Sequence, residues 1–186
     1  MACGDITAGV SYNCDTPLQG GADATLYLIN SSQLDGFVQD GTDPNILTAL
    51  TLSTGALAYA FQGFKRSLAP TWEAVNTDAG QTVYRHAVQF FLFDISQATK
   101  NVIEDLALGG YVGIIQNNTR DENAFEVLGL GAGLEMQPGA LRAVNDNNGV
   151  YTINLATPEN EFEGKLPRTL YDGTSFASTK TYVEGL

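Results

Sequence analysis

Apolar and polar side chains alternate most regularly over residues 82–93. In an extended chain, alternate side chains point to the same face, so this stretch predicts a strand with one buried face. The residues on that face are Tyr84, His86, Val88, Phe90 and Leu92. Similar runs between turn residues predict further strands at residues 25–30, 46–53, 56–64, 111–116, 124–130, 141–144 and 150–155.

Turn sequences between these runs predict how the strands connect. Thr54 and Gly55 separate two of the runs, which favours a hairpin over residues 46–64. Further hairpin turns are predicted at NNTRDEN (117–123) and NDNNG (145–149). Most neighbouring strands are therefore expected to be antiparallel.

Three polar segments lack this periodicity. Residues 1–24 are rich in glycine and aspartate and predict an extended N-terminal arm. Residues 31–45 and 65–81 are rich in turn residues and predict long surface loops. Because loops of that length often contact partners, we expect these two to hold neighbouring molecules.

The sequence DISQATKNVIEDLALGG carries the one strong helical pattern. Asp94 or Ser96 can cap its start, and Gly109 with Gly110 predicts a left-handed stop. Apolar residues recur at intervals of three and four, as on one face of a helix: Ala98, Val102, Ile103, Leu106 and Ala107. We expect a helix over about residues 95–108 to pack on a face of the sheet.

This order of elements predicts a mainly β fold, an antiparallel β-sandwich or partial barrel with one flanking helix. A doubly wound fold needs several crossover helices, and beyond residues 95–108 only a short helix near 179–183 is predicted. The 186-residue chain has no repeats and no proline- and serine-rich linker. Residues 1–186 are therefore expected to form a single domain.

Acidic residues outnumber basic residues by 21 to 9, and the formal net charge is −12. A basic groove for nucleic acid and a polybasic membrane contact are both excluded by this balance. Charged residues make up only 16% of the chain, below the roughly 25% of an average soluble domain. Low charge density is typical of a subunit that buries surface against copies of itself, so the composition favours self-assembly.

The start of the chain shows no signal-peptide pattern, and no apolar run reaches the about 20 residues of a membrane-spanning helix. We therefore expect the protein to remain in the cytoplasm or in a particle assembled there. Cys3 and Cys14 are interpreted as free thiols in that compartment, although a disulfide between them is formally possible.

No combination of residues predicts an enzyme, a cofactor or a metal site. His86 is the only histidine and has no GxSxG elbow to accompany it, so we interpret it as a core or interface residue. The sequence GLGAGLEM (129–136) lacks the GxGxxG spacing of a dinucleotide loop, and its glycines are interpreted as sites of tight bends. Cys3 and Cys14 lack the basic neighbours that activate a thiol.

Acidic clusters point to turns and solvated faces. DGTDPN and NDNNG share features with calcium loops, but position 157 is threonine where an EF-hand needs glutamate, so both are predicted to be turns. Two sets are candidates for a strand face that lines a channel: Glu159, Glu161 and Glu163, and less regularly Glu122, Ala124 and Glu126. The first set is otherwise a solvated acidic face, because its members project from one side of an extended chain.

Several segments resemble structural proteins of phages and prophages of the Bacteroidetes. They are ITAGVSYNCDTPLQGG, TLYLIN, GALAYAFQGF, HAVQFFLFD, GYVGIIQNN, AFEVLGLGAGLE and STKTYVEGL. In size and predicted architecture the chain is similar to the tail-tube (major tail) proteins of long-tailed bacteriophages. This resemblance implies copies joined side by side into hexameric rings, which stack as a tube around a DNA channel.

The resemblance also implies partners and a location, and it supplies no catalytic residues. The expected partners are the chain itself, other tail or connector proteins, and DNA passing through the lumen without specific binding. The expected location is the virion, assembled in the host cytoplasm, and an acidic channel wall would repel DNA phosphates. Two alternatives stay open: another virion component (head-tail connector ring, tail terminator or decoration protein), and a monomeric β-sandwich module that binds carbohydrate or acts as an adhesin.

Overall fold

The computed structural model describes residues 21–64, 66–78, 80–139, 141–142 and 149–186. Within them the chain forms one mixed sheet of eleven strands and two α-helices. The strands are β1 (Ala22–Asn30), β2 (Leu34–Gln39), β3 (Ile46–Leu52), β4 (Tyr59–Gln62), β5 (Leu68–Asn76), β6 (Thr82–Leu92), β7 (Gly110–Asn117), β8 (Phe125–Leu128), β9 (Leu134–Met136), β10 (Tyr151–Ala156) and β11 (Arg168–Leu170). The helices are α1 (Gln97–Leu106) and α2 (Phe176–Glu184).

The predicted mainly β fold with a flanking helix is confirmed. The second helix, predicted near residues 179–183, is also present as α2. Most of the predicted arm, 1–24, lies outside the described residues, and its last three residues belong to β1.

Strand β7 lies at the centre of the sheet. One of its edges pairs with β1, and its other edge pairs with β9 at Gly110 and Tyr111 and with β8 from Gly113 to Gln116. Six consecutive residues of β7 are buried, because each face of the strand packs against a separate apolar core. The sequence of β7 therefore lacks the alternation of a strand with one exposed face.

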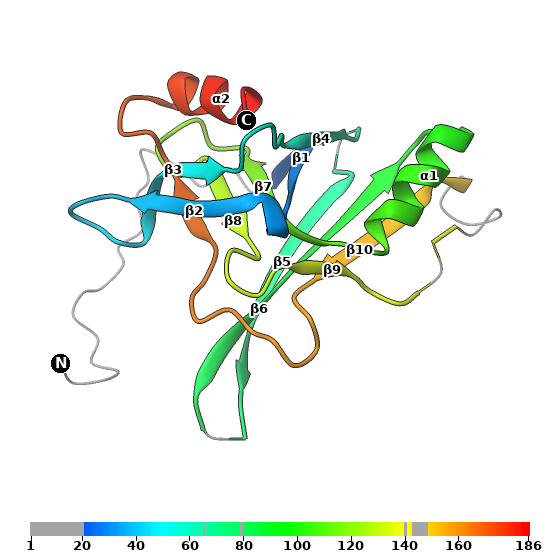
Figure 1. The fold of residues 1–186 in the computed structure, drawn as a ribbon, viewed down its shortest axis with the longest axis horizontal. Coiled ribbons are helices and arrows are strands. Elements are labelled where there is room, and N and C mark those ends of the chain that lie inside the picture. The colour runs from blue at the N-terminus through cyan, green and yellow to red at the C-terminus, as the bar shows by residue number, and fades with distance from the viewer. Residues whose placement is uncertain (1–20, 65, 79, 140, 143–148) are drawn as a thin grey trace.

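The sheet divides where β8 ends and β9 begins. From β8 it continues through β11 and β3 to β2, and from β9 it continues through β10 and β6 to β5. Figure 1 shows these two branches spreading apart from β7, the first beside α2 and the second beside α1. Neighbouring strands are antiparallel except β3 and β11, which are parallel.

Each branch covers its own apolar core. The first core lies beside the second branch, which leads to β5. It receives Ile103 and Leu106 from α1, together with side chains of β1, β6, β7 and β10. The second core lies beside the first branch, which leads to β2, and it receives Val183 from α2, together with side chains of β3, β7, β8 and β11. The buried face predicted for residues 82–93 is confirmed at its centre, where His86, Val88 and Phe90 are buried.

Two segments predicted to be loops contain the strands at the two ends of the sheet order. Within residues 31–45, β2 pairs with β3, and within residues 65–81, β5 pairs with β6 along nine residues. Pairing with a regular neighbouring strand supplies the backbone hydrogen bonds in both segments, which overrides their weak strand propensity. Some of the turn residues lie within the strands themselves, such as Asp35 and Gly36 in β2 and Pro70 in β5.

The hairpin predicted over residues 46–64 is wrong. Strand β3 pairs with β2 and β11, whereas β4 pairs with β1. The two strands separate because their apolar side chains belong to different cores: Leu47 of β3 packs in the second core, and Phe61 of β4 contacts Phe90 of the first core at a ring separation of 5.5 Å. The hairpin predicted between the strands now seen as β7 and β8 is confirmed.

Helix α1 begins as predicted but ends differently. The Ser96 hydroxyl accepts a hydrogen bond from the Thr99 amide at 3.3 Å and so caps the first turn. Neither Gly109 nor Gly110 has a positive φ, so the predicted left-handed stop is wrong. Gly109 provides space instead, because a Cβ at this position would collide with the Tyr111 hydroxyl.

Replacing Leu106 with alanine should lower the free energy of unfolding by about 2–5 kcal/mol, because this side chain is 4% exposed in the first core. Val102 lies on the same helix and is 42% exposed, so Val102→Ala should cost less than about 1 kcal/mol. Urea unfolding followed by circular dichroism measures both variants. Equal, small losses would show that α1 does not contribute to the core.

Candidate functional site

The loop between β8 and β9, residues 129–133, lies where the sheet divides. Gly129 and Gly133 have φ values of +67° and +77°, and a Cβ at Gly129 would lie 2.6 Å from the Leu134 Cγ. Glycine at position 129 is therefore required by the backbone conformation and by the close approach of Leu134. The interpretation of this glycine-rich sequence as a tight bend is confirmed.

Glu163 places its carboxylate in this loop. Its Oε1 accepts hydrogen bonds from the backbone amides of Gly131 and Ala132, each at 2.8 Å, and the residue is 8% exposed. Successive backbone N–H groups of this kind form an anion-binding nest. The glycine-rich loop therefore binds an anion, and the chain itself supplies that anion.

His86 reaches the same loop from β6. The Gly129 amide donates to Nδ1 at 3.2 Å, so Nε2 carries the proton and donates to the Lys165 carbonyl at 3.1 Å. Burial lowers the pKa of His86, and the Glu163 charge with the Lys165 carbonyl offsets part of that effect. Because backbone groups occupy both nitrogens, His86 acts as a buried structural residue, and no acid-base role is open to it in this conformation.

The segment that carries Glu163 is also attached to β6. The Tyr84 amide donates to the Glu163 carbonyl at 2.8 Å, and the Glu163 amide donates to the Tyr84 carbonyl at 2.9 Å. Together with the Nε2 bond of His86, these contacts fix residues 163–165 on the second branch. Glu163 then ties this segment to the loop at the end of β8. The two branches are thus joined at the point where they diverge.

The predicted acidic face of Glu159, Glu161 and Glu163 is wrong. Glu159 and Glu161 are exposed, whereas Glu163 is buried. Residues 159–162 do not form a strand, and the Glu161 amide bonds to the Pro158 carbonyl in a turn. The turn removes the alternation, and the hydrogen bonds of the nest stabilise the third carboxylate inside the protein.

The second alternating set also fails to form one polar strand face. Glu122 is exposed, Ala124 is buried and Glu126 is half-buried in β8. Burial raises the pKa of Glu126, and a hydrogen bond from the Asn117 side chain opposes this rise. Glu126 thus lies within the fold rather than on an open wall.

The turn interpretation of DGTDPN is confirmed. The Asp40 carboxylate accepts from the amides of Thr42 and Asp43, and Asp43 accepts from the Asn45 amide. The bond from the Asp43 amide, and to a smaller extent the bond from the Thr42 amide, lower the pKa of Asp40. No group of three His, Cys, Asp or Glu side chains in the described part of the chain is arranged to hold a metal ion. Cys3, Cys14 and most of NDNNG lie outside the described residues.

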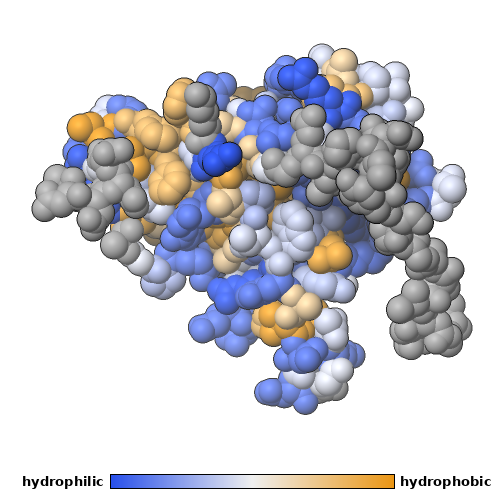
Figure 2. Space-filling view, turned by 180° about the vertical axis from the view of Figure 1, so that it is seen from behind, coloured by the Kyte–Doolittle hydropathy of each residue, from blue (hydrophilic) through white to orange (hydrophobic). Residues whose placement is uncertain are grey.

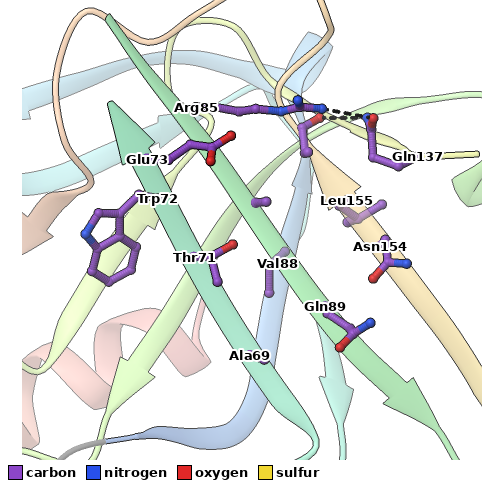
Figure 3. A pocket seen from close by; sticks show the side chains of 12 residues that line it. Ala69, Thr71, Trp72, Glu73, Arg85, Val88, Gln89, Gln137, Asn154 and Leu155 are labelled. Atoms are coloured by element: carbon purple, nitrogen blue, oxygen red, sulfur yellow. Dashed lines mark hydrogen bonds between the residues drawn. The ribbon is translucent and has the colours of Figure 1, made fainter. Parts of the chain in front are cut away.

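An open pocket of about 610 Å³ lies on the outer face of β5, β6 and β10. Its floor consists of small residues, Ala69, Ala87 and Ala156, and polar side chains surround it: Thr71, Glu73, Arg85, Gln89, Gln137 and Asn154. We call this surface the amide shelf. Figure 3 shows Arg85 extended toward Gln137, with a hydrogen bond of 3.3 Å, and the Trp72 ring pointing away from the other labelled side chains.

No protein-family model, curated protein or solved structure matches the chain at a significant level. Among the described residues, neither helix has the length and apolar character needed to cross a bilayer.

Sequence reasoning missed the pairing of Glu163 with residues 129–133. The available signal was the glycine-rich loop itself, since backbone amides that are buried away from water require acceptors. It also missed the amide shelf, because a third of the lining residues come from β5, a segment predicted to be a loop.

The depressed pKa of His86 gives a pH dependence of known sign. The unfolded chain, with a histidine pKa near 6.5, binds a proton more readily than the folded chain does. The contribution of neutral His86 is therefore complete above pH 6.5 and is lost as the pH falls through the folded-state value. Each unit of depression corresponds to about 1.4 kcal/mol.

We expect the free energy of unfolding to fall between pH 7 and pH 5, and His86→Asn to flatten this part of the curve, since asparagine keeps an acceptor near the Nδ1 position but does not titrate. Urea unfolding at several pH values measures both proteins. The depressed carboxyl pKa values of Asp40, Asp94 and Asp172 act below this range. The raised pKa of Glu126 stabilises the folded chain as the pH falls, but it is common to both proteins, so the difference between their curves reports His86. Parallel curves for the two proteins would contradict the assignment.

Glu163→Ala should lower the free energy of unfolding by about 2–4 kcal/mol, because two amide donors lose a charged acceptor. Glu161→Ala is the matched control, since Glu161 is exposed and two residues away, and it should change stability by less than about 0.5 kcal/mol. Denaturant unfolding compares them. If both variants match the parent in stability, the hydrogen bonds from Gly131 and Ala132 to Glu163 do not stabilise the point at which the sheet divides.

Proposed function

We propose that the chain is a self-assembling structural subunit of the phage tail-tube type, which forms rings that stack into a conduit for DNA. The observation that supports this most directly is the free sheet edges at β2 and β5. The main order of strands ends at these two strands, and neither has a further neighbour within the described residues. Within the same residues a third edge strand, the short β4, pairs with β1 alone. Unpaired edges are templates for pairing with another chain.

Both edges expose apolar side chains. On β2, Phe37 is 39% exposed and Val38 is 51% exposed, and on β5, Trp72 is 41% exposed. Because the two edges differ, contact between them is head to tail, and repetition of such a contact generates a closed ring or an open filament. The hairpin of β5 and β6 projects well beyond the body of the molecule, where a neighbouring copy can reach it (Figure 1).

A second apolar surface favours contacts outside the plane of the sheet edges. Figure 2 shows hydrophobic side chains gathered on the side of the molecule that carries α1. The exposed apolar residues from the end of β6 to the end of α1 are Phe93, Ile95, Val102 and Leu108. Such a surface suits packing between successive rings, because large exposed apolar patches mark interaction sites.

The amide shelf is the best candidate for a channel wall. Its polar side chains alternate with buried residues along β6 and β10, as expected for a strand with one face in water. Along β5 the shelf residues Thr71 and Glu73 are exposed. Arg85, the one cation of the shelf, bonds to Gln137 and faces Glu73 across the strands. A wall without clustered cations would let DNA phosphates pass.

The carbohydrate-binding alternative is less well supported. Sugar rings stack on exposed aromatic faces, and Trp72, the one aromatic residue among those that line the pocket, has its ring turned away from the other labelled side chains (Figure 3). Another virion component would share the free edges and apolar surfaces, so it stays the second candidate.

Val38→Lys on β2 should weaken self-association at least tenfold, because a lysine on an edge strand opposes pairing with another strand. Thr54→Lys adds the same charge at an exposed turn residue that belongs to neither edge strand and should associate like the parent. Sedimentation velocity over a range of concentrations, with negative-stain images of rings or tubes, measures this. A parent protein that stays monomeric at high concentration would refute the proposed function.

A further inference from the structure

A pocket of about 360 Å³ lies beside the point at which the sheet divides. It is lined by residues of β2, of the loop 129–133 and of the segment 163–168. Its apolar walls include Phe37, Leu130 and Leu166. Its charged side chains are Glu163, Lys165 and Arg168, so cations outnumber acids here although the chain carries a net charge of −12.

Arg168 has an unused hydrogen-bond donor at this pocket. Its guanidinium carbon lies 5.1 Å from the centre of the Phe37 ring, a cation-π contact that holds the group in place. Its Nη1 is buried and has no hydrogen-bond partner. The salt bridge found among the described residues joins Lys180 to Glu184, and none reaches Arg168.

The other two charges do not neutralise Arg168. Lys165 donates from Nζ to the side-chain oxygen of Asn45 at 2.7 Å, and that acceptor is uncharged. Glu163 directs its Oε1 to the amides of the glycine-rich loop, so its charge is compensated there. The pocket therefore offers the positive charges of Lys165 and Arg168 to an incoming anion. Because Nη1 is buried, the guanidinium has to turn for that nitrogen to donate to the anion.

We propose that this pocket receives the carboxylate of an aspartate or glutamate from a second copy of the chain, and this inference rests on the proposed function. A guanidinium matches a carboxylate in charge and geometry, and apolar walls strengthen the pair by excluding water. The pocket opens beside the free edge of β2, since Phe37 belongs to that strand and Leu166 at its rim is 49% exposed. A neighbour that pairs with β2 brings some of its 21 acidic residues to this position.

Arg168→Gln should raise the dissociation constant of self-association at least tenfold in sedimentation velocity, and Lys165→Gln should raise it by a smaller factor. Lys165 is exposed, so its replacement tests the pocket even if Arg168→Gln unfolds. Arg120→Gln, an exposed arginine in the turn between β7 and β8, is the control that removes the same charge elsewhere.

Zero-length carbodiimide cross-linking identifies the incoming acid. Isotope-labelled and unlabelled copies are mixed, and the expected product joins Lys165 of one copy to an aspartate or glutamate of the other. The Lys180–Glu184 pair, at 3.8 Å, reports that the reaction works. If the parent assembles, yet Arg168→Gln and Lys165→Gln assemble equally well and no mixed cross-link forms, the pocket proposal is overturned and the proposed function stands. A parent that never assembles overturns both.

Discussion

One edge of β7 has to pair with two strands that lead to different branches of the sheet, and the rest of the architecture depends on how the chain meets this constraint. β8 and β9 share that edge, so the five residues between them must turn sharply without losing backbone hydrogen bonds. The buried carboxylate of Glu163 satisfies the amides of Gly131 and Ala132, and His86 satisfies the amide of Gly129. The two separate apolar cores, and the edge strands β2 and β5 at the ends of the two branches, follow from this division.

The constraint also explains why the amides of the glycine-rich loop are bound by a side chain of the protein itself. A nest of backbone amides attracts any anion, but here the acceptor is covalently part of the chain and is held by backbone pairing with Tyr84. The local concentration of this carboxylate exceeds that of a free ion in solution. Acidic residues in this protein therefore serve the interior as well as the surface.

The sequence predicted the elements whose burial pattern is local. β6 has one buried and one exposed face, and α1 has an apolar stripe ending in Ile103 and Leu106, so both were identified from periodicity. β2 and β5 were missed because their regular structure comes from pairing with β3 and β6, which propensity does not encode. Glu163 was misjudged for a related reason: its neighbours in sequence indicated a solvated face, while the residues that bind it lie about thirty positions earlier.

The parallel pairing of β3 with β11 has a consequence for the order in which the chain folds. The Tyr182 hydroxyl bonds to the backbone of Leu50, 132 residues earlier in the sequence, and β3 gains its inner neighbour only from β11. During synthesis, β2 and β3 therefore leave the ribosome long before their partners exist. Contacts of such high sequence separation form slowly, because the entropy of closing a long loop is lost before they are made. The nascent chain can therefore give β3 its inner neighbour only after residues 168–170 have been made.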